Sequence, residues 1–510
     1  MIADPPSPPG RERPLVAAGH PAVVAAAHEV LDAGGNAFDA VVAAGFAGTV
    51  AEPALTSLAG GGFCLARTAA GEEVLVDFFV DTPGLGLASP PVPHFDEVVV
   101  NFEVATQAFH CGPGSIAVPG GLPGYLHVHR RFGRVDLGTV VAPALRLARD
   151  GVDLLPRQAG IVSLLERILL RTPEGRALFA PGGRLVAVGD RLRNPGLAEV
   201  LAELGRGGDV RFSGGPLAAA LLAVTAADGL VTAGDLAAYR VVERDPLALH
   251  WQGRRVLTNP APSFGGTLIA AALARLDGLD LGPDDPRGPA ALVAVAAEVD
   301  RHRRAILAGA DPVRPADPAD PSILRPGRRG SARGTTHVSV WDGEGGAAAM
   351  TTSNGECSGD VIPGTGILTN NILGEDDLHP DGFHASPPGL RVASMMAPTV
   401  VVGPDGATEV VVGSGGSKRI RSAVTQVLVN VLVHGLDPRA AVEAPRAHWD
   451  VDHVEVEPGF GSGALDALAA LGPVNRWPDR SVYFGGAHLV VPGLGAAGDP
   501  RRDGAASPSG

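Results

Sequence analysis

The sequence predicts a mixed fold of the α+β class, with helices in the first part and strands in the last third. Apolar residues recur at helical spacing over residues 21–33, 196–204 and 216–227. From residue 336 onward the pattern changes to that of short strands, at residues 336–342, 346–352, 399–402 and 409–412. Residues 309–334 separate the two regions. This segment is rich in Pro, Asp, Arg and Gly, so we expect an exposed linker.

The opening elements have recognisable boundaries. Pro21 suits the first turn of a helix, and Gly34-Gly35 provides a stop. Residues 38–47 are small and apolar, which indicates a second, buried helix. Strands are expected at residues 63–67 and 74–79 as a hairpin-like pair, with a short strand at 256–258.

Both ends of the chain are expected to be loose. Residues 1–14 are rich in proline and read as a disordered lead. The tail after about Gly498 is rich in Gly, Pro and Arg, and we expect it to be loose as well. Prolines and charges stand where a signal peptide needs an apolar run, so the sequence predicts a cytoplasmic protein.

Composition argues against several classes of partner. The formal net charge is -14, whereas nucleic acids and acidic membranes call for a basic face. The three cysteines, Cys64, Cys111 and Cys357, are far apart and odd in number, so they indicate neither a disulfide framework nor a zinc cluster. The metal motif H-E-x-x-H and the pair C-x-x-C are absent from the sequence, and we expect no metal or cofactor.

Thr335 is the candidate nucleophile. It follows Gly334 where the linker ends and the strand pattern begins. Cleavage between the two residues would place the Thr335 hydroxyl beside its own α-amine, whose pKa near 8 suits a general base close to neutral pH. A histidine partner is then unnecessary, and the sequence has no G-x-S-x-G motif.

A glycine-rich loop is the candidate oxyanion site. Residues 413–417, Gly-Ser-Gly-Gly-Ser, lie between a predicted strand and a predicted helix, where backbone N–H groups can converge on a developing negative charge. A proline at Gly416 is expected to remove one donor and leave the fold largely intact if the site tolerates the φ of proline. Two nucleotide-site interpretations are weaker. The spacing of a P-loop is absent, and the G-x-G-x-x-G match at residues 493–498 leaves no room for a dinucleotide-binding unit.

Segments along nearly the whole chain, about residues 16–501, resemble the gamma-glutamyltranspeptidase family. The opening GHPAVVAAAHEVLDAGGNAFDAVVAAGFAGTVAEP is followed by GGGF at 60–63 and VPGGLPGYLHVHRRFGR at 118–134. The later segments are GTTHVSVWD, GTGILTNN, RVASMMAPT, GSGGSKRI and AVEAPRAHWD. Together these motifs are specific, although each alone is weak.

The resemblance implies a fold and a division of the chain. The fold is the four-layer αββα sandwich of N-terminal-nucleophile hydrolases. The precursor is cut into a large subunit, residues 15–334, and a small subunit, residues 335–510, which stay associated as a heterodimer. The family's nucleophile falls on Thr335.

The resemblance also assigns further site residues. The hydroxyl that assists the nucleophile falls on Ser353 or Thr352, and the oxyanion pair on Gly416 and Ser417. The asparagine of the donor site falls on Asn354. The acidic residue that would bind the α-amine falls on Glu375, Asp376 or Asp377, and one serine of the family's usual pair falls on Ser394.

One departure from the family affects the expected specificity. Members that bind glutathione usually hold its α-carboxylate with an arginine, and Phe79 stands at that position here. A charge-assisted contact is thereby replaced by an apolar ring. Substitute cations are conceivable from other loops, namely Arg67, Arg333 and Arg391.

Three functions follow from the residues and the resemblance. The default is a self-processing threonine amidohydrolase or acyltransferase that acts on gamma-glutamyl groups of small molecules, as in glutathione. The same-fold alternative is a cephalosporin-acylase-like amidase whose acyl donor lacks the usual α-carboxylate grip. The third is a non-processing binding protein of this fold, which the intact Thr335, Asn354 and Gly416 disfavour.

Overall fold

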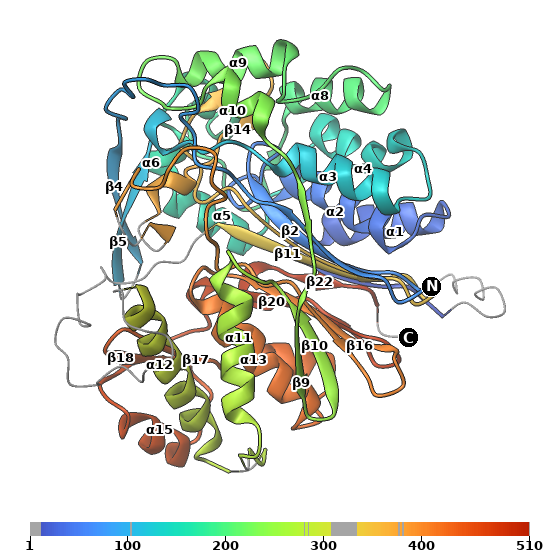
Figure 1. Cartoon of the computed structure of the whole chain (residues 1–510), viewed down its shortest axis with the longest axis vertical. Coiled ribbons are helices and arrows are strands. Elements are labelled where there is room, and N and C mark those ends of the chain that lie inside the picture. The colour runs from blue at the N-terminus through green and yellow to red at the C-terminus, as the bar shows by residue number, and fades with distance from the viewer. Residues whose placement is uncertain are drawn as a thin grey trace.

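The computed structural model describes residues 12–102, 105–279, 281–283, 285–307, 334–375, 378–379 and 382–508. Residues 309–333 of the linker expected at 309–334 lie outside the described residues, as do residues 1–11 of the expected lead. In the described part the chain is a mixed α and β structure built around two large sheets (Figure 1).

The first sheet combines strands from both sides of the linker. Its order is β22-β1-β11-β12-β2-β3-β8. The strands before the linker are β1 (Leu15–Ala18), β2 (Gly61–Arg67), β3 (Glu73–Phe78) and β8 (Val242–Arg244). Those after it are β11 (Thr335–Trp341), β12 (Ala347–Ser353) and β22 (Ala505–Ala506). The predicted hairpin of β2 and β3 is confirmed as an antiparallel pair.

The second sheet faces the first. Its order is β21-β20-β16-β15-β10-β9. The strands are β21 (Gly495–Ala497), β20 (Gly486–Val491), β16 (Thr408–Gly415), β15 (Thr399–Val402), β10 (Arg254–Thr258) and β9 (Leu247–Trp251). Strand β11 packs against β16 and β20, so the two sheets meet through the strand that begins at Thr335.

Helices cover the outer side of each sheet (Figure 1). Helices α1 (Pro21–Asp32), α2 (Ala37–Ala51) and α3 (Gly121–Phe132) pack on the first sheet. Every residue of α2 is buried, as its small apolar sequence predicts. Helices α11 (Phe264–Leu276) and α13 (Arg419–Leu432) pack on the second sheet. Among the described residues, none of the helices has the length and apolar character needed to span a bilayer.

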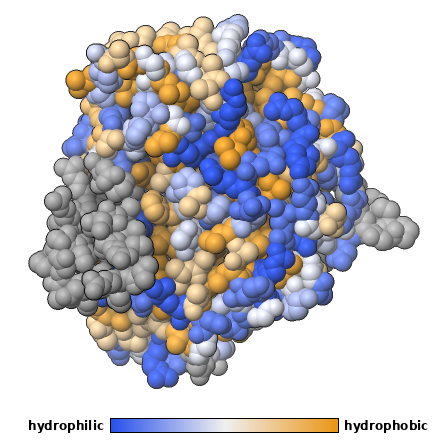
Figure 2. All heavy atoms as spheres, viewed as in Figure 1, coloured by the Kyte–Doolittle hydropathy of each residue, from blue (hydrophilic) through white to orange (hydrophobic). Residues whose placement is uncertain are grey.

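Polar residues are common on the surface, whereas the apolar residues are concentrated in the core. Figure 2 shows hydrophilic residues spread over much of one face, interrupted by smaller apolar areas. The apolar side chains are instead concentrated in one cluster between the first sheet and its helices, and in a second cluster between the sheets and around the second sheet. Burial of this kind is the main favourable term in folding.

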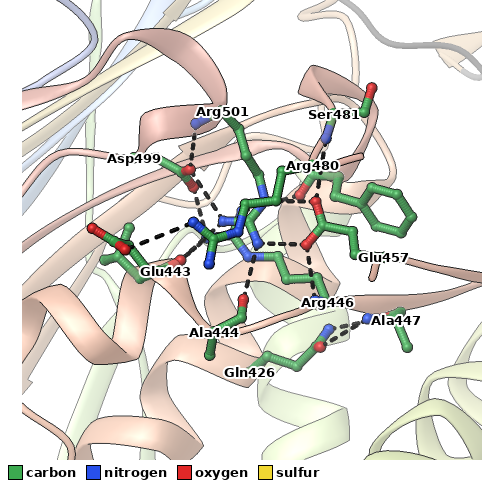
Figure 3. Close-up of polar contacts among 12 residues, drawn as sticks. Gln426, Glu443, Ala444, Arg446, Ala447, Glu457, Arg480, Ser481, Asp499 and Arg501 are labelled. Atoms are coloured by element: carbon green, nitrogen blue, oxygen red, sulfur yellow. Dashed lines mark hydrogen bonds and ion pairs between the residues drawn. The ribbon is translucent and has the colours of Figure 1, made fainter. Parts of the chain in front are cut away.

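The prediction of a loose tail is wrong for residues 499–508. Asp499, Arg501 and Arg502 are buried, and β22 adds an edge strand beside β1. Figure 3 shows why the tail is ordered: the Arg501 guanidinium bonds to Glu457, Asp499 and backbone carbonyls of the preceding helix segment. Composition indicates a loose tail because Gly, Pro and Arg are common in loops, but here Arg501 pairs with buried carboxylates and Arg502 bonds to the Thr335 carbonyl oxygen.

Candidate active site

Thr335 begins β11 and lies on the side of the first sheet that faces the second sheet. Its neighbour across the sheet is Ser353, the last residue of β12. The side chains of Val338 and Val340 point the other way, toward the helices, so the alternation of the strand turns Thr335 inward. Thr335 is 4% exposed.

The hydroxyl of Ser353 connects the two sides of the Gly334–Thr335 peptide bond. It donates to the Gly334 carbonyl oxygen at 2.6 Å. It accepts from the Thr335 hydroxyl at 3.2 Å and from the Gly355 backbone N–H at 3.1 Å. The same group therefore polarises the carbonyl that precedes Thr335 and orients the Thr335 oxygen. Of the two predicted candidates, Ser353 makes this contact, whereas Thr352 bonds to Thr56.

Glycines permit the close packing around this bond. A Cβ at Gly334 would lie 1.9 Å from the Gly355 carbonyl oxygen, so a side chain there would collide with backbone. From the opposite sheet, a Cβ at Gly415 would lie 2.1 Å from the Thr335 carbonyl oxygen. The end of β16 therefore packs directly against the start of β11.

The predicted oxyanion residues follow this contact. Gly416 has φ +119° and Ser417 has φ +52°, which turn the chain from β16 into α13. The condition for tolerating proline at Gly416 is therefore not met, because proline fixes φ near -65°. A Gly416→Pro change would distort the loop and would not report on a single donor.

Asn354 and Glu375 lie beside the Ser353 end of β12. The Asn354 amide donates to the Thr369 carbonyl oxygen at 3.3 Å. Its buried Oδ1 has no hydrogen-bond partner among the described residues. A Cβ at Gly355 would lie 2.9 Å from Glu375 Oε1, so Glu375 is adjacent to this turn. Asp376 and Asp377 lie outside the described residues.

Ser394 lies farther along the second sheet. Its hydroxyl accepts from the Met396 backbone N–H at 3.1 Å, and its carbonyl accepts from Phe264 and Ser263. These contacts tie it to the start of α11, and none of them joins it to Thr335.

Phe79 continues a row that crosses the first sheet from Thr335. The registers pair Thr335 with Ser353, Ser353 with Gly61, and Gly62 with Phe78, the residue before Phe79. Neighbouring strands are about 4.8 Å apart, so Phe79 lies about three strand spacings from Thr335. Its ring is 1% exposed and stacks on Phe63 at 5.6 Å.

Of the substitute cations suggested by the sequence, Arg391 is ion-paired and Arg67 lies at the far end of β12. Arg391 forms ion pairs with Asp77 at 3.2 Å and Asp81 at 2.9 Å and also bonds to the Phe79 carbonyl oxygen. Arg67 pairs with Ala347 at the opposite end of β12 from Ser353. Arg333 lies outside the described residues.

Two buried charged residues next to Thr335 were missed by sequence reasoning. Arg502 Nη1 donates to the Thr335 carbonyl oxygen at 2.7 Å. Both carboxylate oxygens of Glu52 lie within 3.1 Å of the Thr336 hydroxyl. The sequence signal for Arg502 is the DPRRDG run at residues 499–504, which lies in the segment that composition predicts to be loose. For Glu52 it was an acidic residue directly after an apolar helix.

The pKa values of this pair are shifted by burial. Burial raises the pKa of the Glu52 carboxyl to about 7, against the opposing effects of Thr336, Arg502 and Gln158. Burial also lowers the pKa of the Arg502 guanidinium to about 10. Arg502 therefore stays charged at neutral pH, while Glu52 titrates near neutrality.

Comparisons with known proteins identify the family of the chain. The chain matches the Gamma-glutamyltranspeptidase family over residues 24–306 and 311–509. It is 33% identical to the acylase ACY 1 proenzyme of Pseudomonas sp. strain SE83, over 90% of this chain and 87% of that protein. It is 31% identical to the glutathione hydrolase proenzyme of Escherichia coli K12, over 87% of this chain and 82% of that protein.

A solved structure supports the fold. The cephalosporin acylase from Bacillus halodurans matches with a TM-score of 0.81 over 99% of both chains, at 24% sequence identity. That identity speaks for the fold alone. The family match over most of the chain, together with two proenzyme relatives of about 30% identity, makes this chain an enzyme and a divergent member of the gamma-glutamyltranspeptidase family.

Proposed function

We propose that this chain is a self-cleaving N-terminal-threonine amidohydrolase or acyltransferase with the four-layer αββα arrangement. The observation that carries the proposal is the Ser353 hydroxyl, which contacts both the Gly334 carbonyl oxygen and the Thr335 hydroxyl. Residues 15–334 would form the large subunit and residues 335–510 the small one. Strands of the two parts are interleaved in the first sheet, because β1 lies between β22 and β11 and β12 pairs with β2, which supports their staying together as a heterodimer.

Self-cleavage would begin with attack of Thr335 Oγ1 on the carbonyl carbon of Gly334. The Oγ1 proton passes to the Thr335 nitrogen as the peptide C–N bond breaks, leaving an ester and a free α-amine. Water then adds to the ester carbonyl, and the C–O bond breaks to give the Gly334 carboxylate and the Thr335 hydroxyl. Ser353, which donates to the same carbonyl oxygen, would stabilise the negative charge that develops in both steps.

The freed Thr335 would then act on external amides. Its α-amine takes the hydroxyl proton as Oγ1 attacks the substrate carbonyl, and returns a proton to the departing amine. The resulting acyl ester is resolved by water, or by an acceptor amine in transfer. Among the described residues, the side-chain partner of the Thr335 hydroxyl is Ser353 and not a histidine, which is consistent with the amine as base.

Cleavage is tested on the purified chain. We expect two fragments, residues 1–334 and 335–510, and an N-terminal sequence of Thr-Thr-His-Val for the smaller one. Thr335→Ala should abolish cleavage, and Ser353→Ala should slow it by about 10²-fold or more, the usual loss for one oxyanion donor. Thr352→Ala is the matched control and should still be cleaved. A single band for the unaltered chain after long incubation would refute the proposal.

The acyl donor is proposed to lack a carboxylate at the usual α position. Phe79 is packed against Phe63 in the core, so this position offers an apolar wall. Arg391, the nearest described candidate cation, is already paired with Asp77 and Asp81. A buried carboxylate without its partner typically costs about 2–5 kcal/mol. Asn354 Oδ1, a buried acceptor, suits an amine on the acyl chain. These features favour the acylase alternative over the gamma-glutamyl default.

Four p-nitroanilide substrates test separately whether the enzyme requires an amine and whether it requires a carboxylate on the acyl group. Gamma-glutamyl carries both the amine and the carboxylate, 4-aminobutyryl only the amine, glutaryl only the carboxylate, and butyryl neither. We expect kcat/KM for 4-aminobutyryl to exceed that for gamma-glutamyl by at least about tenfold, equivalent to about 1.4 kcal/mol. Equal or faster turnover of the gamma-glutamyl compound would show that a cation reaches the carboxylate. That result would restore the default.

The same set of substrates tests Phe79 directly. Phe79→Arg should raise turnover of the two carboxylate-bearing compounds relative to the other two. Phe79→Leu, the packing control, should leave the ratios unchanged. Because the ring is buried, the arginine variant could unfold, and the four ratios of the unaltered enzyme then decide the question.

A further inference from the structure

Arg502 lies directly against the residue that would become the new N-terminus. Its Nη1 donates to the Thr335 carbonyl oxygen at 2.7 Å, and its side chain is buried. Two glycines leave room for it: a Cβ at Gly486 would lie 2.2 Å from Arg502 Cδ, and a Cβ at Gly415 would lie 3.0 Å from Arg502 Nη1. The packing of β16 and β20 therefore leaves space for the Arg502 side chain beside Thr335.

Glu52 approaches the same strand from the other side of the sheet. It follows α2 and contacts the Thr336 hydroxyl at 3.0 and 3.1 Å. Gln158 links the two groups, because its amide lies 3.5 Å from Glu52 Oε1 and 3.4 Å from the Arg502 carbonyl oxygen. A positive and a negative group thus flank the first two residues of β11.

We propose that Arg502 and Glu52 are positioning residues that set the basicity of the α-amine released on Thr335. The inference rests on the proposed cleavage at Gly334–Thr335. Arg502 would hold the Thr335 carbonyl and disfavour a proton on the amine of the same residue. Glu52, when ionised, would act in the opposite direction.

Distance makes the electrostatic effect substantial. Within one residue the backbone nitrogen and carbonyl oxygen are about 3–3.5 Å apart, so the Arg502 charge lies within about 6 Å of the amine. A like charge at that distance lowers the pKa of an amine by about one unit or more in a partly buried site. A nucleophile's own amine acts as a base only when it is neutral, so this shift extends activity to lower pH.

The ionisation of the pair itself fits this role. Burial lowers the pKa of Arg502 to about 10, which leaves the guanidinium charged at neutral pH. Burial raises the pKa of Glu52 to about 7, so its charge appears near neutrality. Among the described residues, further charged or titratable groups lie near this pair: Glu356 and Glu375 after β12, Arg419 on α13, Arg446, then Asp499 and Asp503 on either side of Arg502, and His337 and His488 between the sheets.

The basicity of the Thr335 amine can be measured without knowing the substrate. Cyanate carbamylates neutral amines, and the rate on the Thr335 amine against pH gives its pKa when followed by peptide mass mapping. Lys418, the single lysine of the chain, lies in a different peptide and serves as the internal reference. The acidic limb of kcat/KM against pH, which reports the free enzyme, gives an independent value on the fastest p-nitroanilide.

The variants should move the midpoint in opposite directions. Arg502→Gln should raise the pKa of the Thr335 amine by about one unit, and Glu52→Gln should lower it by about half a unit. Arg502→Lys keeps the charge and should stay close to the unaltered enzyme. An anchor without electrostatic influence would instead lower kcat and leave the midpoint where it was.

The outcomes separate this inference from the proposed function. If the unaltered chain is not cleaved, the proposed function fails and the inference fails with it. If the chain is cleaved and the midpoint is the same in all variants, the inference alone is overturned. If Arg502→Gln is not cleaved, Glu52→Gln still tests the inference, with Arg502→Lys as the charge-preserving control. An unmoved midpoint in Glu52→Gln contradicts the proposal.

Discussion

Arg501 and Arg502 are adjacent in the sequence and both are buried, yet their surroundings differ in charge. Arg501 lies between the carboxylates of Glu457 and Asp499, with its remaining N–H groups on the carbonyls of Val442 and Ala444 (Figure 3). The Arg502 guanidinium instead donates to the carbonyl oxygen of Thr335, and its charge acts on Glu52, whose ionisation burial opposes. Arg501 thus bonds to two carboxylates, whereas Arg502 bonds to a backbone carbonyl oxygen near a carboxyl group of raised pKa.

The carboxylates beside these arginines show the same contrast. Burial opposes ionisation of Asp499, but the guanidinium groups of Arg446 and Arg501 outweigh it and hold the pKa of Asp499 well below its usual range. Burial wins at Glu52 and raises its pKa to about 7. The first arrangement stabilises the packing of the segments that follow residue 334. The second places a carboxyl group of raised pKa beside the start of β11, a perturbation that is common at functional sites.

The largest expected effect follows from breaking the neutralised cluster. Arg501→Met should lower the free energy of unfolding by about 3–5 kcal/mol, because it removes the cation paired with the buried Glu457 and leaves Asp499 with Arg446 alone. Arg480→Met is the matched control: Arg480 lies at the edge of the same cluster, 3.7 Å from Glu443, and is 42% exposed. Such a surface pair is worth at most about 1 kcal/mol.

Urea unfolding measures both changes. The variants are made in the Thr335→Ala background, so that dissociation of cleaved fragments does not enter the comparison. Equal losses for Arg501→Met and Arg480→Met would mean that the buried cluster contributes no more than a surface ion pair. The contrast drawn between Arg501 and Arg502 would then have no energetic basis.

Much of the fold could be predicted from the sequence, because its signals are local. The helix over residues 38–47 is extended to Ala37–Ala51 in the structure, and the β2–β3 hairpin differs from its prediction by one or two residues at its ends. The strand at Thr335 and the division of apolar residues between its two faces also follow from alternation. These elements depend on periodicity and on turn residues that lie nearby in the chain.

The parts of the site that escaped prediction depend on distant contacts. Glu52 and Arg502 are 450 residues apart, and their meeting around β11 requires the first sheet to join strands from both ends of the chain. The φ of Gly416, which rules out proline, is likewise set by packing against Gly485. The nucleophile and the hydroxyl at Ser353 could be assigned from the resemblance, although their catalytic roles remain proposals.

The smallest expected effect sharpens the contrast through pH. Between about pH 4.5 and 7 the folded protein holds a proton on Glu52 that the unfolded chain has released, since the folded pKa is the higher one. The unfolded state therefore binds fewer protons, and the stability contributed by this group falls as pH rises through that window. Asp499 has the opposite sign: its contribution is present above its ordinary pKa and is lost on acidification below it.

Glu52→Gln should remove the Glu52 term and keep the shape of the side chain. The difference in free energy of unfolding between this variant and the Thr335→Ala parent should shift by about 2–3 kcal/mol in favour of the variant from pH 4.5 to pH 8. Glu443→Gln is a matched control nearer the surface. A difference that stays constant, or that favours the parent as pH rises, would mean that Arg502 keeps Glu52 ionised as Arg501 keeps Asp499. The two arginines would then be electrostatically alike, and the amine of Thr335 would sit beside a neutralised pair.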